Sequence, residues 1–378
     1  MSDNKIPNSI VGIIKFLEGK NLSEDNYQKE LTRFIEAKAR KYGIPITGTF
    51  ELTPYCNLDC KMCYVHLNSA QFEKAQLLPV QTWLNIIKQS REAGMVHATL
   101  TGGECLTYPG FDEIYLYLYN MGIKPSVLTN GVLIDQKRIS FFKQYPPRII
   151  QITLYGSSED AYERVTGHRV FHTVIHNLRM LRDAEIPVKI SITPNKYMEK
   201  EVRSLFETIE EFGFEYTINA NLVLPRENTG RDLQDLPIDR YVEIYKISAE
   251  MKKNITLSPI DPNELPDDIN VSNKKYGLVC GAGRSMFGIT YEGKLIPCIS
   301  LHEISADPIK CGFKNAWKQV NEIVEKYPFP EECGDCVYFK RCLNCVAMHK
   351  NAPQKGHCDR RICERTKRLI CEGFIPLP

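Results

Sequence analysis

Two hydrophobic periods alternate along the chain from about residue 46 to residue 225. Short stretches rich in β-branched residues are typical of strands, and the stretches between them carry apolar residues every three or four positions. Val174, Ile175, Leu178 and Leu181, for example, would share one face of a helix. The expected strands are 47–53, 97–101, 125–129, 149–154, 188–193 and 216–219, and the expected helices are 80–93, 111–120, 135–144, 171–184 and 199–212.

This alternation predicts an α/β fold with a parallel sheet, in which the helices are the crossovers. Six units form a sheet that is open or partly closed as a barrel, with working residues at the carboxyl ends of the strands. We expect an N-terminal helical segment over 1–45, the α/β core over 46–225, a connector over 226–279 and a cysteine-rich domain of short elements over 280–378. Helical patches are expected at 26–41 and 241–251.

Composition is that of a globular protein, with 43% hydrophobic and 25% charged residues among 378. Lysine and arginine number 48 against 46 acidic residues, so the charge indicates neither a nucleic-acid binder nor a membrane-surface binder. No apolar run approaches the ~20 residues that span a bilayer. The apolar stretch 10–14 is broken by Lys15 and lacks a cleavage site, so we expect no signal peptide and a cytoplasmic protein.

The 14 cysteines are unevenly distributed. Four lie before residue 280, and ten lie between Cys280 and Cys371. Disulfides are disfavoured in a reducing cytoplasm. This distribution therefore indicates metal binding, iron–sulfur clusters or redox chemistry.

Cys56, Cys60 and Cys63 form a C-x3-C-x2-C motif directly after the first expected strand. Three thiolates do not complete a tetrahedral zinc site, which would need a fourth ligand such as His66. They do suffice for three irons of a [4Fe–4S] cluster, which leaves the fourth iron open.

The second expected strand ends in Thr101-Gly102-Gly103-Glu104. Glycines let the backbone approach a ligand closely, and the Glu104 carboxylate suits an ammonium group. Alone, this motif is also compatible with an ordinary turn, but here it falls at the same end of the sheet as the cysteine loop.

The two motifs together resemble those of the radical S-adenosylmethionine (radical SAM) enzymes. The resemblance implies a partial (β/α)6 barrel in which Cys56, Cys60 and Cys63 hold a [4Fe–4S] cluster. The open iron of that cluster chelates the amino and carboxylate groups of S-adenosylmethionine, and reductive cleavage yields a 5′-deoxyadenosyl radical that abstracts a substrate hydrogen. It also implies that Gly102, Gly103 and Glu104 meet the methionine amine.

Further cofactor contacts follow from the same resemblance. It suggests Asn130, Gln151 and Thr153 for the ribose hydroxyls, Arg164 for the carboxylate, and the backbone of Met62 for adenine. Alternatives stay open: a turn residue at 130, a β-former at 153 and a surface residue at 164.

Cys105 follows the glycine motif where proline is common in that family. It is either a small buried hydrophobic residue or a hydrogen-atom donor, as in radical peptide epimerases.

The later cysteines form C-x12-G-x4-C from Cys280 to Cys298 and C-x2-C-x5-C-x2-C from Cys333 to Cys345. This order resembles the SPASM domain, which carries auxiliary [4Fe–4S] clusters in enzymes that modify peptides, although its usual last pair has x3. The paired motifs also invite a zinc interpretation.

By this resemblance, one auxiliary cluster takes Cys280, Cys298 and Cys345. The other takes Cys333, Cys336, Cys342 and a distal cysteine, which is Cys363 or alternatively Cys358. The fourth ligand of the first cluster is Cys311, Cys358 or Cys371, or one iron is open and binds a substrate thiolate.

The leading hypothesis is a radical SAM maturase that modifies a ribosomally synthesised peptide, forming a thioether or another carbon-centred bond with three [4Fe–4S] clusters. It would need an external electron donor of the flavodoxin or ferredoxin type. Either a separate protein or the cysteine-rich domain itself would recognise the leader peptide. Such clusters are destroyed by oxygen, so an anaerobic organism is expected. The alternatives are a formylglycine-generating sulfatase maturase, a peptide epimerase that uses Cys105, and a zinc-stabilised scaffold without catalysis.

Overall fold

The computed structural model describes residues 24–65, 67, 69–198, 201–219, 236–251, 276–339, 342, 345 and 358–375. His66, the alternative zinc ligand, and most of the predicted connector lie outside the described residues.

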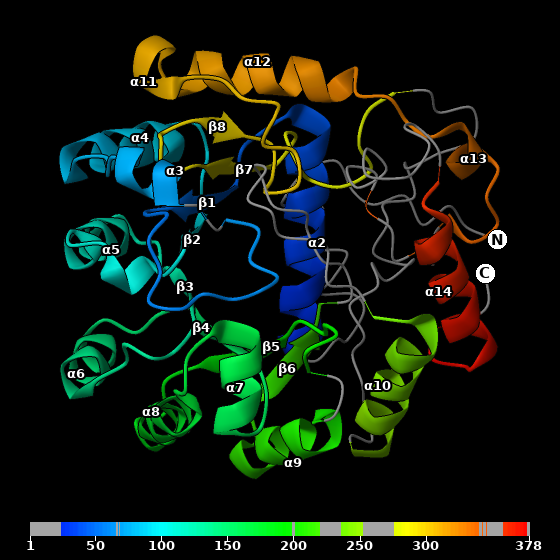
Figure 1. Cartoon of the computed structure of the whole chain (residues 1–378). Helices are drawn as coiled ribbons and strands as arrows, with labels where there is room; N and C mark the ends of the chain where they lie inside the picture. The colour runs from blue at the N-terminus through cyan, green and yellow to red at the C-terminus, as the bar shows by residue number, and fades with distance from the viewer. Residues whose placement is uncertain are drawn as a thin grey trace.

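Six parallel strands form the centre of the molecule and pair with one another in chain order. They are β1 (Thr47–Glu51), β2 (His97–Thr101), β3 (Ser126–Thr129), β4 (Ile149–Leu154), β5 (Val188–Ile192) and β6 (Glu215–Ile218). The crossover helices are α4 (Val80–Glu92), α5 (Phe111–Asn120), α6 (Gln136–Gln144), α8 (Phe171–Asp183) and α9 (Val202–Phe212). They line one side of the curved sheet (Figure 1). The predicted α/β fold with a parallel sheet is confirmed, and the element ends shift by only a few residues.

The remaining elements flank this core. They are α2 (Glu24–Tyr42), α3 (Ser69–Lys74), the 3-10 helix η1 (Cys105–Thr107), α7 (Glu159–Thr166), α10 (Ile238–Met251), α11 (Pro308–Cys311), α12 (Phe313–Glu325), α13 (Glu331–Gly334) and α14 (Arg360–Cys371). The helices α12 and α14 have 13 and 12 residues, so the expectation of short elements after Cys280 underestimates this region. Figure 1 shows α12 along one edge of the molecule and α14 beside α10.

Two strands from the cysteine-rich segment extend the same sheet, which the sequence did not predict. Strand β7 (Met286–Ile289) pairs in parallel with β1, and β8 (Leu295–Ile296) pairs antiparallel with β7. The resulting order is β6-β5-β4-β3-β2-β1-β7-β8. These strands have four and two residues, too few for a hydrophobic period to distinguish them from loops.

Aromatic side chains join this extension to the barrel. The Phe287 ring on β7 lies 4.9 Å from that of Phe313, 6.0 Å from that of Phe50 and 6.1 Å from that of Trp317, measured between centroids. The indole N–H of Trp317 donates to the carbonyl oxygen of Gly43 at 2.7 Å, just before β1 begins. The C-terminal segment is therefore packed into the barrel core.

Strand residues alternate between two environments. Along β4, Ile150, Ile152 and Leu154 are buried, whereas Gln151 and Thr153 are only partly buried. Successive side chains of a strand point to opposite faces. The buried set therefore packs against the helices, and the polar set lines the other face of the sheet.

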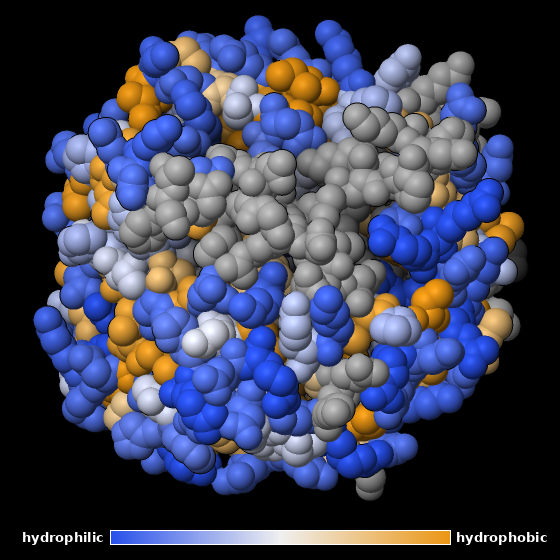
Figure 2. All heavy atoms as spheres, in the orientation of Figure 1, coloured by the Kyte–Doolittle hydropathy of each residue, from blue (hydrophilic) through white to orange (hydrophobic). Residues whose placement is uncertain are grey.

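No helix within the described parts of the chain is long and apolar enough to cross a membrane. On the face shown in Figure 2, hydrophobic residues are interspersed with hydrophilic ones.

We expect Phe287→Ala to destabilise the protein by about 3–5 kcal/mol, because it leaves a cavity among large aromatic rings. Met286→Ala is the matched control, since Met286 precedes it on β7 and is 44% exposed. Denaturant titration gives the free energy of unfolding of both variants. Equal losses of stability in Phe287→Ala and Met286→Ala would contradict the packing role of Phe287.

Candidate active site

The cysteine loop, residues 56–63, begins five residues after the end of β1. The amide of Leu58 donates to Cys56 Sγ at 3.4 Å, and the amide of Cys63 donates to the carbonyl oxygen of Cys60 at 3.1 Å. Burial raises the pKa of the Cys56 thiol to about 12, and the nearby Glu104 and Cys63 add to this rise. No disulfide joins any of the described cysteines. The three thiols thus share one small region beside a carboxylate.

Gly102 and Gly103 lie directly against the segment that leads into this loop. A Cβ atom at Gly102 would stand 2.4 Å from the carbonyl oxygen of Thr53, and one at Gly103 would stand 2.5 Å from that of Tyr55. The amide of Gly103 donates to the Thr53 carbonyl oxygen at 2.8 Å. These close contacts explain why both positions need glycine. The sequence had suggested a ligand as the neighbour, but here the neighbour is the chain itself.

Glu104 is 1% exposed and accepts hydrogen bonds from several neutral donors. Thr129 Oγ1 lies 2.9 Å from each carboxylate oxygen, the amide of Asn130 donates to Oε2 at 2.8 Å, and the amide of Leu106 donates to Oε1 at 3.1 Å. Burial raises the pKa of Glu104, and these donors oppose that rise. A cation bound beside this carboxylate would stabilise its charged form.

Asn130 connects the carboxylate to the cysteine loop. Its side-chain Nδ2 donates to Asn57 Oδ1 at 2.7 Å and lies 3.7 Å from Cys56 Sγ. Its Oδ1 accepts from the amide of Val132 at 3.0 Å, as in an Asx turn. Asn130 therefore also acts as a turn residue, the alternative that the sequence left open.

Gln151 and Thr153 lie on the same polar face of the sheet, as predicted from their spacing. Tyr155, two residues further on, hydrogen-bonds Cys60, and burial together with the thiol groups of the cysteine loop raises its pKa. Sequence reasoning missed Tyr155, Asn57 and Thr129. In the sequence, these residues are distinguished only by lying within two positions of Cys56, Asn130 and Thr153.

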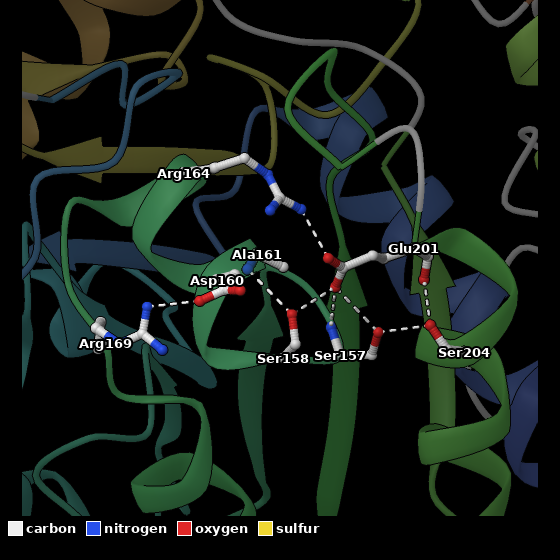
Figure 3. Close-up of polar contacts among 8 residues, drawn as sticks. All are labelled: Ser157, Ser158, Asp160, Ala161, Arg164, Arg169, Glu201 and Ser204. Carbon is white, nitrogen blue, oxygen red and sulfur yellow. Dashed lines mark hydrogen bonds and ion pairs between the residues drawn. The ribbon is translucent and has the colours of Figure 1, made fainter.

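Arg164 lies in the last turn of α7 and donates to Glu201 Oε1 at 2.7 Å (Figure 3). Its side chain is 45% exposed, so part of it remains accessible to solvent. Met62 is partly buried and packs against the hydrophobic core.

Cys105 is fully buried in η1 and donates from Sγ to the carbonyl oxygen of Leu128 at 3.2 Å. Burial raises the pKa of its thiol, and the neighbouring Glu104 adds to this rise. This environment is that of a small packed residue. The hydrogen-donor role stays a prediction.

Cys298 follows β8 and interacts electrostatically with Cys280 and Cys345. Burial raises the pKa of Cys298 to about 12, and the other two thiols add to it. These three cysteines, predicted to share a cluster, therefore lie close together. Cys311 lies apart on α11, where Sγ donates to the carbonyl oxygen of Asp307 at 3.1 Å.

A second group of cysteines gathers around α13 and the start of α14. Burial raises the pKa of Cys333 to about 12, with contributions from Cys358, Cys342 and Cys336. Cys363 in turn contributes to the raised pKa of Cys358. Both distal candidates therefore lie at this group, and Cys358 is the one of the two that contributes to the raised pKa of Cys333. Cys371 is exposed at the end of α14.

Within the residues that the structure describes, no group of three or more His, Cys, Asp or Glu side chains could hold a single metal ion. Ligands of one ion must converge on one point. Each iron of a four-iron cluster takes a single protein ligand, so its cysteines stand further apart. The cysteine loop, with its three thiols beside a buried carboxylate, fits such a cluster better than a zinc ion.

Residues 50–209 match the Radical SAM superfamily. The chain therefore contains a radical SAM domain and is an enzyme, and this superfamily uses S-adenosylmethionine and a [4Fe–4S] cluster.

The chain is similar over most of its length to several proteins. It is 22% identical to the subtilosin biosynthesis protein AlbA of Bacillus subtilis, over 97% of this chain and 81% of that protein. It is also 24% identical to the AdoMet-dependent heme synthase of Methanosarcina barkeri, over 79% of this chain and 90% of that protein. Among solved structures, Streptococcus suis SuiB bound to S-adenosylmethionine aligns with a TM-score of 0.69 at 16% identity, over 94% of this chain and 86% of SuiB. The enzyme anSMEcpe with bound AdoMet aligns with a TM-score of 0.68 at 15% identity, over 87% of this chain and 97% of that chain.

Replacing Thr129 with Val should weaken S-adenosylmethionine binding about tenfold, because the buried Glu104 carboxylate loses a hydrogen-bond donor. Equilibrium dialysis of the anaerobically reconstituted protein gives the dissociation constant. Thr208→Val is the control, since the Thr208 hydroxyl donates only to the Ser204 carbonyl oxygen on α9. Equal affinities in the two variants would show that the Thr129–Glu104 contact is irrelevant to the cofactor.

Proposed function

We propose that the protein is a radical SAM maturase that modifies a ribosomally synthesised peptide with the help of two auxiliary clusters. The observation that carries this proposal is the presence of two further cysteine groups beside the barrel that holds the cysteine loop. A radical SAM core alone needs only the first three thiolates. The additional groups support the branch of this superfamily that acts on peptides.

In this proposal, Cys56, Cys60 and Cys63 hold the cluster that binds S-adenosylmethionine, and the bound cluster supplies the electron that cleaves it. Glu104 faces the amine of the cofactor with its buried negative charge, held in place by Thr129 and Asn130. Gly102 and Gly103 keep that carboxylate close to the loop. Gln151 and Thr153 offer hydrogen-bonding groups to the ribose. The partly exposed guanidinium of Arg164, which also pairs with Glu201, offers its positive charge to the carboxylate.

Each of the two groups of thiols is assigned one auxiliary cluster. The first takes Cys280, Cys298 and Cys345, and the second takes Cys333, Cys336, Cys342 and Cys358. Cys363 then stands beside the second cluster as a neighbouring thiol. With three protein thiolates, a [4Fe–4S] cluster at the first group would keep one iron open for a thiolate of the substrate.

The wider organisation of the enzyme follows the same proposal. The core spans 46–225 and the auxiliary region 280–378, with β7 and β8 of that region built into the sheet of the core. An external donor of the flavodoxin or ferredoxin type supplies the electrons. A separate protein binds the leader peptide. Because the clusters are sensitive to oxygen, the enzyme works in an anaerobic cytoplasm.

The peptide as substrate is supported by several relatives whose names refer to peptide products or substrates. AlbA matches over 97% of this chain and SuiB over 94%. The sporulation killing factor maturation protein SkfB and a PqqA peptide cyclase match over 79%, as the heme synthase does. SuiB has also been solved with its precursor peptide SuiA, and it aligns in that form with a TM-score of 0.65. The N-terminal and C-terminal parts of the chain thus find counterparts in peptide maturases.

The second candidate is an enzyme of the sulfatase-maturing type, which the likeness to anSMEcpe supports. Tandem mass spectrometry of the modified peptide separates the two. A crosslink removes one hydrogen from each of two residues and joins their fragments, whereas formylglycine formation changes one cysteine or serine to an aldehyde. Oxidation of serine also removes two hydrogens, so reaction of the aldehyde with a hydrazide confirms the assignment. An epimerase would leave the mass unchanged and introduce deuterium from heavy water.

Replacing Cys56, Cys60 and Cys63 together with Ala should abolish 5′-deoxyadenosine formation and remove about four of about twelve irons per chain. Iron analysis and chromatography of the cleavage product measure the two effects. The matched control replaces Cys105, Cys311 and Cys371, which lie outside all three thiol groups, and should keep its full iron content. Cleavage that persists in the first variant would refute the assignment.

Replacing Cys358 with Ala should lower the iron content by about four per chain, because the second auxiliary cluster loses a ligand. The same change at Cys363 should leave the iron content within error of the wild type. The reverse result would make Cys363 the distal ligand.

A further inference from the structure

Helix α7 is held at two points by one carboxylate from a distant part of the chain. Ser158, the N-cap of α7, accepts from the amide of Ala161 at 3.1 Å and donates to Glu201 Oε2 at 3.0 Å. Arg164, in the last turn of the same helix, donates to Glu201 Oε1 at 2.7 Å (Figure 3). Glu201 directly precedes α9. It therefore bridges the two ends of α7 and fixes that helix to α9.

Glu201 is itself well anchored. The Ser157 amide lies 3.4 Å and the Ser157 hydroxyl 3.2 Å from Oε2, and that hydroxyl also contacts the Ser204 hydroxyl at 2.6 Å. The Glu201 side chain is 20% exposed. Its pKa lies below the usual value because the hydrogen bonds from Arg164 and the two serines outweigh the opposing effect of burial. The carboxylate is thus charged and fully coordinated by donors.

The C-terminal end of α7 contacts the backbone of the cysteine loop. The amide of Asp59 donates to the Thr166 carbonyl oxygen at 2.8 Å, and the amide of Lys61 donates to the Val165 carbonyl oxygen at 2.8 Å. The last carbonyl groups of a helix have no partner within the helix, so they are available for such bonds. Asp59 and Lys61 flank Cys60 on both sides. The backbone position of Cys60 is therefore set by the last turn of α7.

From these contacts we propose that Glu201 is a positioning residue for the cysteine loop, acting through α7 on Cys60. Its charge holds the Ser158 and Arg164 ends of the helix in one arrangement. That arrangement presents the Val165 and Thr166 carbonyl groups to the loop. The role of the loop in cluster binding rests on the proposed function, but the mechanical link between Glu201 and the loop amides does not.

Glu201→Gln tests this link because it keeps the shape of the side chain and removes its charge. A charged hydrogen-bond acceptor contributes more than a neutral one, so opening of the loop amides should become about tenfold more frequent. Hydrogen exchange of the full-length, anaerobically reconstituted protein measures this in peptides that contain Asp59 and Lys61. Exchange in α12, on the far edge of the sheet, should not change.

Glu163→Gln is the matched control on the same helix. Glu163 pairs with Arg169 at 2.8 Å, but both side chains are more than half exposed, so this pair contributes little. Exchange at Asp59 and Lys61 should equal that of the wild type in this variant. Equal acceleration in both variants would overturn the specific role of Glu201.

A chelator provides a second measurement on the same samples. In Glu201→Gln, about four irons per chain should be lost about tenfold faster than in the wild type, while the remaining iron leaves at the wild-type rate. A wild type without iron at the loop would refute the proposed function. If the wild type holds iron at the loop, but amide exchange and iron loss in Glu201→Gln equal those of the wild type, the positioning role is refuted and the proposed function stands.

Ser157→Ala keeps the test decisive if Glu201→Gln fails to fold. It removes one hydroxyl donor from Glu201 and leaves Arg164 and Ser158 in place. Exchange at the loop amides should then rise about threefold, given the smaller contribution of one hydrogen bond. No change in this variant would also count against the proposal.

Discussion

The burial of the Glu104 carboxylate is the constraint on which the arrangement of the site depends. A buried charge is costly unless hydrogen bonds or a partner charge compensate for it. Here the compensation comes from Thr129, the last residue of β3, and from Asn130, which follows it, while Glu104 itself follows β2. Asn130 then reaches Asn57 in the cysteine loop after β1. One carboxylate thus ties together the ends of three neighbouring strands.

Close backbone packing makes this arrangement possible. Gly102, with φ of +150°, brings the end of β2 against Thr53, and Gly103 lies against Pro54 and Tyr55. Any side chain at these positions would push the second strand end away from the loop. Glu104 would then lose its place beside Cys56. The glycines therefore act on the site through the spacing of two strands, before any ligand is considered.

Much of the fold was predictable from the sequence because hydrophobic periods over ten or more residues are strong signals. The six strands, their crossover helices and α10 all follow from them, and the motifs placed Cys56, Glu104 and Asn130 at one edge of the sheet. The pairing of β7 with β1 was not predictable, since four residues carry no clear period. The contacts of Tyr155 and Glu201 were also hidden. They depend on side chains brought together from separate crossover units, which spacing along the chain does not reveal.

The pairing of β7 with β1 also determines where Cys280 and Cys298 lie relative to the cysteine loop. Cys280 precedes β7 and Cys298 follows β8, so these two cysteines are positioned by strands of the same sheet that leads into Cys56. The register Thr47↔Met286 and Phe50↔Ile289 fixes these strands by backbone hydrogen bonds. Such a sheet does not stretch as a linker does, and the ring of Phe287 resists sliding because it is enclosed by Phe50, Phe313 and Trp317. The separation of the cysteine loop from Cys280 and Cys298 is therefore set by the pairing and register of these strands.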